Sequence, residues 1–280
     1  MKGAPAIRPK HTTLIEMLDA AAQSELGLVF VDKKEQDHEV PFARIREQAL
    51  SVAADLVSRG VRKGDRVALV LPTCPEFVEC FFGVLCAGAI PVPLYPPLRL
   101  GKLDEFHRRT TAMLTAVDAV MVVTDERIRR FLGVAVANSA PRLGCVTASS
   151  LAGPVSDAVE VAGDDIAVIQ FSSGTTNDPK PVALTHANLL SNLASLEQYI
   201  TKDGAPYPIG VTWLPLYHDM GLIGNLLSAF YVPGRLVLLP PELFVANPGA
   251  WLRAISRHRG TITAAPSFAF GLCLKRIRDE

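Results

Sequence analysis

The sequence predicts an α/β fold in which mostly parallel sheets carry helices on both faces. Short apolar runs, typical of buried strands, alternate with longer amphipathic segments along most of the chain. Such alternation favours βαβ units, in which a helix crosses between two parallel strands. The chain has 280 residues, of which 49% are hydrophobic, which is enough apolar material for a buried core. We expect two α/β subdomains, residues 1–160 and 161–280.

The helices are predicted where apolar residues recur every three or four positions. The clearest one runs over residues 42–59 and stops at Gly60, because glycine is common just after a helix end. Pro75 opens the next helix, since proline is favoured in a first turn. Further helices are predicted at 12–24, 103–117, 186–200, 219–230, 248–258 and from Pro266 onward.

The strands are predicted between these helices, where short apolar runs are bounded by turn residues. A stretch rich in glycine, alanine and serine, residues 141–163, is predicted to connect the two halves of the fold. The predicted strands are 28–31, 66–71, 90–94, 119–124, 165–171, 211–213, 235–239 and 261–264.

Charge and cysteine content exclude several classes of function. Lysine plus arginine and aspartate plus glutamate number 28 each, so the chain has no electrostatic bias toward nucleic acid. Five cysteines without a CxxC pair favour reduced thiols and a cytoplasmic location. The uncharged run 80–98 is about long enough to span a bilayer. Four prolines interrupt it, so we expect no membrane span.

A loop rich in hydroxyl groups follows the predicted strand 165–171. Ligands of open α/β sheets bind at the carboxyl ends of strands, and backbone N–H groups in such loops form anion-binding concavities. Gly174 lets the backbone approach a bulky anion, and Lys180 adds a positive charge. The residues alone favour a phosphate-binding loop without Walker A spacing, the alternative being a surface turn. Its candidate ligands are Ser172, Ser173, Gly174, Thr175, Thr176 and Lys180.

A second informative segment covers residues 213–224. The predicted strand ends at Trp213, Pro215 turns the chain, and a helix begins after His218, with Asp219 complementing the helix dipole. A lone histidine is more often a hydrogen-bonded structural residue than a catalytic one. The apolar residues that follow His218 also fit plain helix packing, so both interpretations stay open at this point.

The loop resembles the signature loop of the adenylate-forming superfamily, which includes acyl-CoA synthetases, nonribosomal peptide adenylation domains, luciferases and fatty acyl-AMP ligases. The resemblance rests on the run 172–176 followed by Pro179 and Lys180, with Asn177 and Pro181 standing where many members have glycine. It implies that ATP and Mg²⁺ are cofactors, that the loop holds the β,γ-phosphates, that Lys180 is catalytic and that Thr175 contacts Mg²⁺.

The second segment resembles the corresponding part of long-chain fatty acyl-AMP ligases, as do residues 91–97 and 265–273. This resemblance implies that His218 acts as a catalytic residue by orienting the substrate carboxylate or the acyl-adenylate. It also implies that the acyl chain enters a tunnel beside this segment. The substrate-binding residues implied are Trp213, His218, Met220, Gly221, Leu222 and Gly224.

The resemblance implies ATP-dependent activation of a fatty acid to an acyl-adenylate with release of pyrophosphate. The acyl group then passes to the thiol of an acyl carrier protein or a polyketide synthase carrier domain. The later motifs of the family are missing, so the chain resembles an incomplete N-terminal domain and is expected to be inactive alone. Two alternatives stay open: an acyl-CoA synthetase fragment, and a noncatalytic acyl- or nucleotide-binding module.

Overall fold

A computed structural model describes residues 7–97, 103–172, 179–201 and 208–277 of the chain. The chain folds into two compact units that are interleaved in sequence. The first unit combines Met1–Ala43 with Ala187–Glu280, and the second unit is Arg44–His186. The subdomains expected from the sequence, residues 1–160 and 161–280, stay a prediction.

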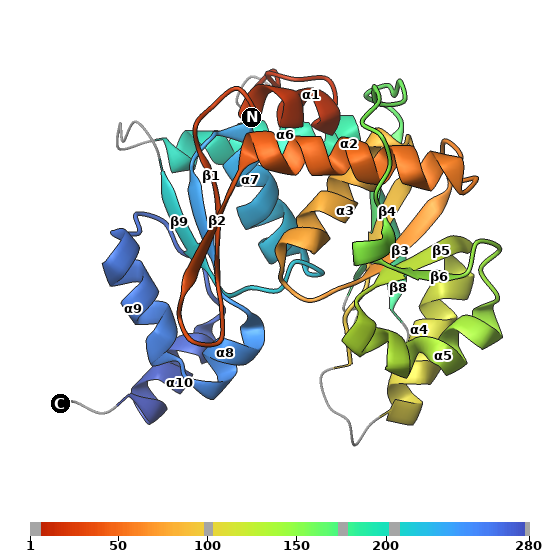
Figure 1. The fold of residues 1–280 in the computed structure, drawn as a ribbon. Helices are drawn as coiled ribbons and strands as arrows, with labels where there is room; N and C mark the ends of the chain where they lie inside the picture. The colour runs from red at the N-terminus through yellow and green to blue at the C-terminus, as the bar shows by residue number, and fades with distance from the viewer. Residues whose placement is uncertain (1–6, 98–102, 173–178, 202–207, 278–280) are drawn as a thin grey trace, which may run out of the picture. The chain divides into compact units, whose positions relative to one another are not determined.

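The second unit contains an all-parallel sheet with the strand order β4-β3-β5-β6 (Figure 1). The chain crosses from β3 to β4 in one direction and from β4 to β5 in the other. Because crossovers between parallel strands are right-handed, the two connecting helices lie on opposite faces of the sheet. The elements are α2 (Phe42–Ser58), β3 (Arg66–Val70), α3 (Pro75–Cys86), β4 (Ile90–Pro93), α4 (Leu103–Ala116), β5 (Ala119–Thr124), α5 (Glu126–Ser139) and β6 (Cys145–Thr147).

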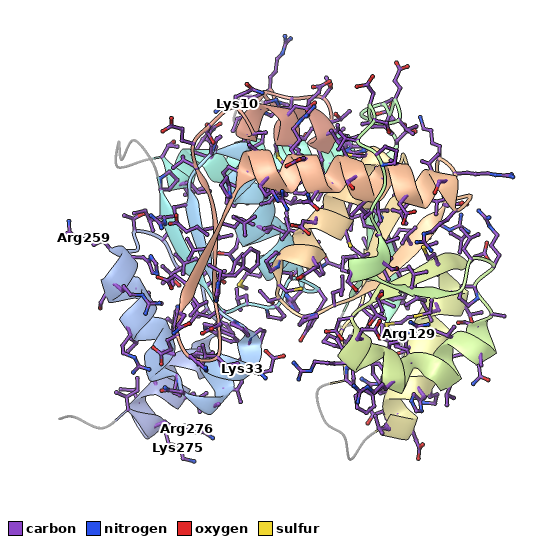
Figure 2. The ribbon with its side chains drawn as sticks, in the orientation of Figure 1. Lys10, Lys33, Arg129, Arg259, Lys275 and Arg276 are labelled. Atoms are coloured by element: carbon purple, nitrogen blue, oxygen red, sulfur yellow. The ribbon has the colours of Figure 1, made fainter. Side chains whose placement is uncertain are left out.

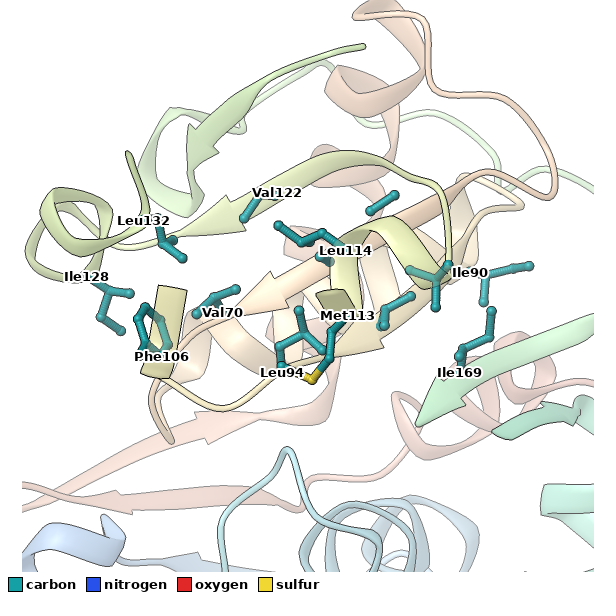
Figure 3. Packing of buried hydrophobic residues seen from close by; sticks show 14 residues of the cluster. Val70, Ile90, Leu94, Phe106, Met113, Leu114, Val122, Ile128, Leu132 and Ile169 are labelled. Carbon is teal, nitrogen blue, oxygen red and sulfur yellow. The ribbon is translucent and has the colours of Figure 1, made fainter. Parts of the chain in front are cut away.

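One hydrophobic cluster of the second unit lies between this sheet and the helices α4 and α5. All residues of β5 are buried, as expected for a central parallel strand covered on both faces. Figure 3 shows side chains from strands and helices meeting in one cluster, which includes Val70, Phe106, Met113 and Val122. Ile169, from a later part of the chain, completes the cluster and ties that part to the sheet.

That later part is an antiparallel hairpin of β7 (Ile166–Ser172) and β8 (Lys180–Thr185). The interior of β7 is buried, whereas no residue of β8 is fully buried. β7 lies next to β4. One strand of the hairpin is therefore anchored in the core, and the other is carried by its pairing with the first.

The first unit contains a mixed sheet with the order β2-β1-β10-β9, in which only the β1–β2 pair is antiparallel. A π-helix, Met220–Leu227, follows β9 and continues directly into α7. The other elements are α1 (Leu14–Ala21), β1 (Gly27–Val31), β2 (Asp37–Pro41), α6 (His186–Ile200), β9 (Ile209–Thr212), α7 (Ser228–Tyr231), β10 (Arg235–Leu238), α8 (Pro241–Ala246), α9 (Gly249–His258) and α10 (Ser267–Arg276).

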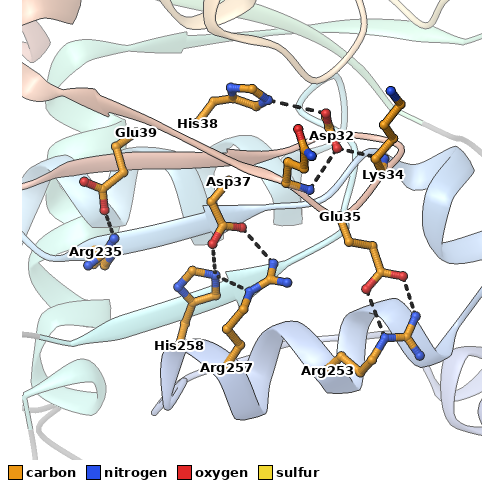
Figure 4. A network of polar contacts seen from close by, with 11 residues as sticks. Asp32, Lys34, Glu35, Asp37, His38, Glu39, Arg235, Arg253, Arg257 and His258 are labelled. Carbon is orange, nitrogen blue, oxygen red and sulfur yellow. Dashed lines mark hydrogen bonds and ion pairs between the residues drawn. The ribbon is translucent and has the colours of Figure 1, made fainter.

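The edge strand β2 has no fully buried residue and is held instead by its pairing with β1 and by ion pairs. Figure 4 shows acidic side chains of the β1–β2 hairpin facing basic side chains of α9 and β10. Asp37 accepts from Arg257 at 2.7 Å and contacts His258 at 3.2 Å. Glu39 pairs with Arg235. Each exposed pair contributes about 0–1 kcal/mol, so their main effect is to fix the position of the hairpin.

The predicted fold class is confirmed, and several element predictions are close to the structure. Residues 119–124 and 186–200 form the strand and the helix that the sequence predicts. The predicted strand 261–264 is wrong, because this segment forms only one bridge, from Ile262 to Gly210 of β9.

All five cysteines are free thiols. None of the helices that the structure describes combines the length and apolarity that crossing a membrane requires.

Two glycines in helices of the second unit offer a test of how closely α2 and α3 pack. A Cβ atom on Gly83 of α3 would lie 2.5 Å from Cγ1 of Val52 and 3.1 Å from the carbonyl oxygen of Ala49, whereas one on Gly133 of α5 would meet nothing within 4 Å. We expect Gly83→Ala to destabilise the protein by about 1–3 kcal/mol through overpacking. The measurement is the free energy of unfolding in urea.

The matched control is Gly133→Ala, which changes the same residue type at an exposed helix position. Alanine is the better helix former by about 0.8–1.0 kcal/mol, so this variant is expected to be as stable as the original or more stable. Equal stabilisation by both substitutions would contradict the close contact between α2 and α3.

Candidate functional site

The β7–β8 hairpin holds the two described ends of the predicted phosphate loop. Ser172 and Lys180 are paired across the hairpin, and the Ser172 hydroxyl donates to the Lys180 carbonyl oxygen at 3.4 Å. Both residues are exposed. The pairing therefore places a hydroxyl group and an ammonium group on neighbouring strand ends, where the loop leaves and re-enters the sheet.

The tip of the loop, with Ser173, Gly174, Thr175 and Thr176, lies outside the described residues. The predicted roles of these residues, including the contact of Thr175 with Mg²⁺, stay predictions. Within the part of the chain that the structure describes, Lys180 has no ion-pair partner, so its charge is not neutralised by a described carboxylate. Three or more His, Cys, Asp or Glu side chains do not gather into a metal-binding group among the described residues.

The opposite end of the hairpin is closed by Asp165 and His186, which flank β7 and β8. The His186 backbone N–H donates to the Asp165 carbonyl oxygen at 3.2 Å, and the Asp165 carboxylate pairs with Lys63 at 2.8 Å. Burial lowers the pKa of His186 to about 4, so its imidazole is neutral near pH 7. The hairpin is thus anchored at the end away from Ser172 and Lys180.

Trp213 follows β9 at the carboxyl end of that strand, as the sequence predicts. Its ring stacks on Phe244 with centroids 3.9 Å apart and planes 7° apart, and Phe268 meets it edge-on at 5.9 Å. Trp213 is buried, and its indole N–H has no hydrogen-bond partner among the described residues. The aromatic stack fixes the point at which the chain leaves the sheet and turns toward His218.

His218 lies in the turn after Trp213 and has an exposed side chain. Its Nδ1 is 2.6 Å from a carboxylate oxygen of Asp219, and the same oxygen accepts from the Met220 backbone N–H at 2.6 Å. Asp219 therefore caps the helix and orients the imidazole, which leaves Nε2 as the ring nitrogen for a ligand. The sequence indicates only the effect of Asp219 on the helix dipole, so its contact with His218 was missed.

The neighbouring Tyr217 is a neutral phenol at physiological pH. Burial raises the pKa of Tyr217 to about 12, and the nearby carboxylate of Glu242 acts in the same direction. It can therefore donate or accept a hydrogen bond in this turn without carrying charge.

The helix after His218 is a π-helix, where the sequence predicts an ordinary helix. Two side chains bond carbonyl groups five residues earlier: Asn225 Nδ2 donates to the Met220 oxygen at 2.7 Å, and the Ser228 hydroxyl donates to the Ile223 oxygen at 3.2 Å. These bonds support the wider turns. Such turns are rare and frequently occur at functional sites.

The predicted substrate-binding residues of this helix face different surroundings. Leu222 is fully buried, Met220 is 41% exposed and Gly224 is exposed. Gly221 is buried against the preceding turn, where a Cβ atom would lie 2.2 Å from the carbonyl oxygen of Pro215. The structure brings His218, Met220 and Gly221 together around this turn. Leu222 packs inward, as a core residue does.

A family model for AMP-binding enzymes matches residues 18–279. The chain therefore belongs to the AMP-binding enzyme family, as the resemblance of its motifs implies. This agrees with the mostly parallel sheets and with the position of the loop at the end of β7.

Curated relatives and solved structures are similar over nearly the whole chain. A protein of Caulobacter vibrioides named "Putative acyl-CoA synthetase" is 33% identical over 96% of this chain and 47% of its own length. A long-chain-fatty-acid–AMP ligase of Mycolicibacterium smegmatis is 33% identical over 88% of this chain and 40% of its own. A medium-chain-fatty-acid–[acyl-carrier-protein] ligase of Teredinibacter turnerae is 30% identical over 91% of this chain and 45% of its own length.

A solved structure from the fatty acyl-adenylate ligases of E. coli and L. pneumophila matches with a TM-score of 0.91. The two sequences are 32% identical, and the match covers 98% of this chain and 50% of the chain in that structure. The chain thus spans about half the length of the relatives that it matches. The predicted family and the resemblance to the N-terminal domain of adenylate-forming enzymes are confirmed. The roles of individual site residues stay predictions.

The close approach of Gly221 to Pro215 can be tested against Gly224 in the same helix. A Cβ atom on Gly224 would meet only Cγ of Met220, at 3.8 Å, which is an ordinary contact. We expect Gly221→Ala to cost about 1–3 kcal/mol of stability, because the turn that carries His218 must shift. Gly224→Ala is expected to change stability by less than about 1 kcal/mol. Urea unfolding of both variants measures the difference, and equal effects would contradict the contact.

Proposed function

We propose that a protein built on this chain activates a fatty acid with ATP, forming an acyl-adenylate and pyrophosphate. The observation that carries the proposal is the β7–β8 register, which sets the Ser172 hydroxyl and the Lys180 ammonium on neighbouring strand ends at the base of the loop. Membership of the AMP-binding enzyme family and the names of the fatty-acid ligases among its relatives support the same reaction.

In the proposed reaction a carboxylate oxygen of the fatty acid attacks the α-phosphorus of ATP. The bond between the α-phosphorus and the bridging oxygen breaks, and its electron pair leaves with pyrophosphate. The Lys180 ammonium balances charge on the leaving phosphates, and the hydroxyl groups of the loop donate hydrogen bonds to them. Mg²⁺, when bound, would neutralise further phosphate charge. The Thr175 hydroxyl is an oxygen ligand of the kind Mg²⁺ prefers.

His218 is proposed to hold the fatty-acid carboxylate for this attack. Asp219 accepts from the Nδ1–H of the imidazole at 2.6 Å, so a carboxylate oxygen of the fatty acid is bonded when Nε2 also carries a proton and donates it. Holding the nucleophile in place lowers the entropic part of the barrier. Trp213, Met220, Gly221 and Gly224 are proposed to line the path of the acyl chain, and the fully buried Leu222 is proposed to pack behind them.

The acyl group is then proposed to pass to the thiol of an acyl carrier protein or a polyketide synthase carrier domain, with AMP as the leaving group. The name of the Teredinibacter turnerae relative supports a carrier protein. The name of the Caulobacter vibrioides relative favours a second candidate, in which coenzyme A is the acceptor.

Adenylation is tested by pyrophosphate release with ATP, Mg²⁺ and a fatty acid. We expect the 280-residue chain alone to be inactive, because it spans about half of its relatives' length and the proposed ATP site would lack the rest. In a full-length protein containing this chain, we expect Lys180→Ala to lower the rate of pyrophosphate release by about 100-fold or more. The reason is that this variant removes a group that stabilises the charge developing on the phosphates.

The matched control is Lys33→Ala, which removes a lysine from the turn between β1 and β2 (Figure 2). This variant is expected to keep the full rate. Pyrophosphate release by the chain alone, above the level of its own Lys180→Ala variant, would contradict the expected inactivity. A full-length Lys180→Ala protein with an unchanged rate would overturn the role of Lys180.

The acceptor is decided by giving the full-length protein equal access to a carrier protein and to coenzyme A. We expect the acyl group to appear on the phosphopantetheine thiol of the carrier, with little acyl-CoA formed. Both thiols are chemically alike, so selectivity must come from protein contacts. Mass spectrometry of the carrier and chromatography of the CoA fraction measure the two products. Rapid acyl-CoA formation would favour the second candidate.

A further inference from the structure

Lys180 lies between two prolines at the start of β8, in the order Pro179-Lys180-Pro181. Pro181 stands where many members of the superfamily have glycine, and neither the fold nor the proposed reaction accounts for it. Its side chain is exposed, so it adds little buried contact to the core. Any effect of this residue on the site therefore acts through the backbone.

The strand β8 has few other restraints at this end. No residue of the strand is fully buried, and among the described residues it pairs only with β7. The Ser172 hydroxyl bonds the Lys180 carbonyl oxygen there, but at a long 3.4 Å. Strand ends with few buried contacts and an exposed backbone open at a low free-energy cost. A lysine at such an end samples many backbone conformations unless something else restricts it.

The two prolines restrict the backbone on both sides of Lys180. The ring of Pro181 disfavours the helical region for the residue before it, which leaves Lys180 an extended backbone. The rings also fix the φ angles of Pro179 and Pro181 at about −65°. Three consecutive residues are thus held in backbone conformations compatible with β8, and this restraint needs no buried side chain.

The pairing register joins this restricted segment to the core of the second unit. Pro181 is opposite Phe171, and Phe171 packs against the hydrophobic cluster shown in Figure 3. The next pair toward the loop is Ser172 with Lys180. Proline has no backbone N–H, and sheets accept it on an edge strand such as β8. The lysine therefore lies one residue beyond an anchored pair, and the proline carries the order of that pair outward to it.

We propose that Pro181 is a positioning residue for Lys180, because it fixes the backbone from which the ammonium extends on the strand end next to Ser172. The inference rests on the proposed function, in which that ammonium balances charge on the leaving phosphates. A lysine whose backbone is already ordered loses less conformational entropy when it binds a phosphate. The side chain itself stays flexible, so the gain is that of one backbone restraint, about two- to fivefold in an equilibrium constant.

The kinetic test measures pyrophosphate release by a full-length protein containing this chain, with ATP, Mg²⁺ and a fatty acid. We expect Pro181→Ala to lower kcat/KM for ATP by about two- to fivefold. Pro181→Gly is expected to lower it further, because glycine has the most backbone freedom to lose. The matched control is Pro154→Gly, at an exposed position of the segment between β6 and β7, which is expected to keep the original kcat/KM.

The same substitutions in a Lys180→Ala background separate positioning from strand stability. If Pro181 acts through Lys180, its replacement has no further effect on the remaining rate, since no ammonium is left to position. A proline that only stabilises β8 would cause the same fold loss in both backgrounds. A proline that only protects the edge of the sheet from pairing with another chain would cause no loss in either. Either of these two results would overturn the inference.

A second measurement needs no catalysis and uses the 280-residue chain. The NMR order parameter of the Lys180 backbone N–H is expected to be about 0.85, as in rigid backbone, and to fall below about 0.6 in Pro181→Gly. A value below about 0.6 in the original chain, or no fall in the variant, would overturn the inference even in an active enzyme. A full-length protein that releases no pyrophosphate, with the order parameter falling as expected, would count against the proposed function and still support the restraint on Lys180.

Discussion

The strongest constraint on this fold is that its central parallel strands must be covered on both faces. β5 meets it with a run of wholly buried residues, and β3 with buried residues after Arg66. The strand order β4-β3-β5 then requires right-handed crossovers in opposite directions, which brings helices to both sides. With both faces covered, the free surface of such a sheet is at the ends of its strands. The candidate site residues of the other two sheets also lie at strand ends: Ser172 ends β7, Lys180 begins β8 and Trp213 follows β9.

The two candidate segments, one in each unit, are held by different kinds of anchor. Ser172 and Lys180 depend on β7, whose Ile169 is part of the core, and on the closed end of the hairpin at Asp165 and His186. His218 depends on the Trp213 stack before it and on Asp219 after it. In both segments an exposed polar side chain stands next to a buried, well-packed residue. This arrangement is how a site keeps its geometry when its ligand is absent.

The sequence predicts the elements whose stability is local and apolar, and it misses those fixed by distant contacts. Residues 119–124 and 186–200 carry strong apolar patterns and were predicted as they occur. The strand β2 has no buried residue and is positioned by β1 and by basic side chains from far along the chain, so no local pattern reveals it. In the site, the positions of Ser172 and Trp213 at strand ends were predictable, whereas the strand β8 that begins at Lys180 was not predicted. The contact between His218 and Asp219 was not, because it depends on a turn geometry that side-chain hydrogen bonds select.

The π-helix lies directly after the turn that carries His218. In an ordinary helix each backbone N–H bonds the carbonyl group four residues earlier. In this π-helix the side chains of Asn225 and Ser228 bond carbonyl groups five residues earlier. The same two side chains line a small pocket beside the helix, so the bonds that support the wide turns also withdraw polar groups from its wall. Glycine at position 224 adds no side chain to that wall. Helix geometry and the pocket wall are therefore linked through the same residues, and a change that restores ordinary helical bonding is expected to alter the pocket.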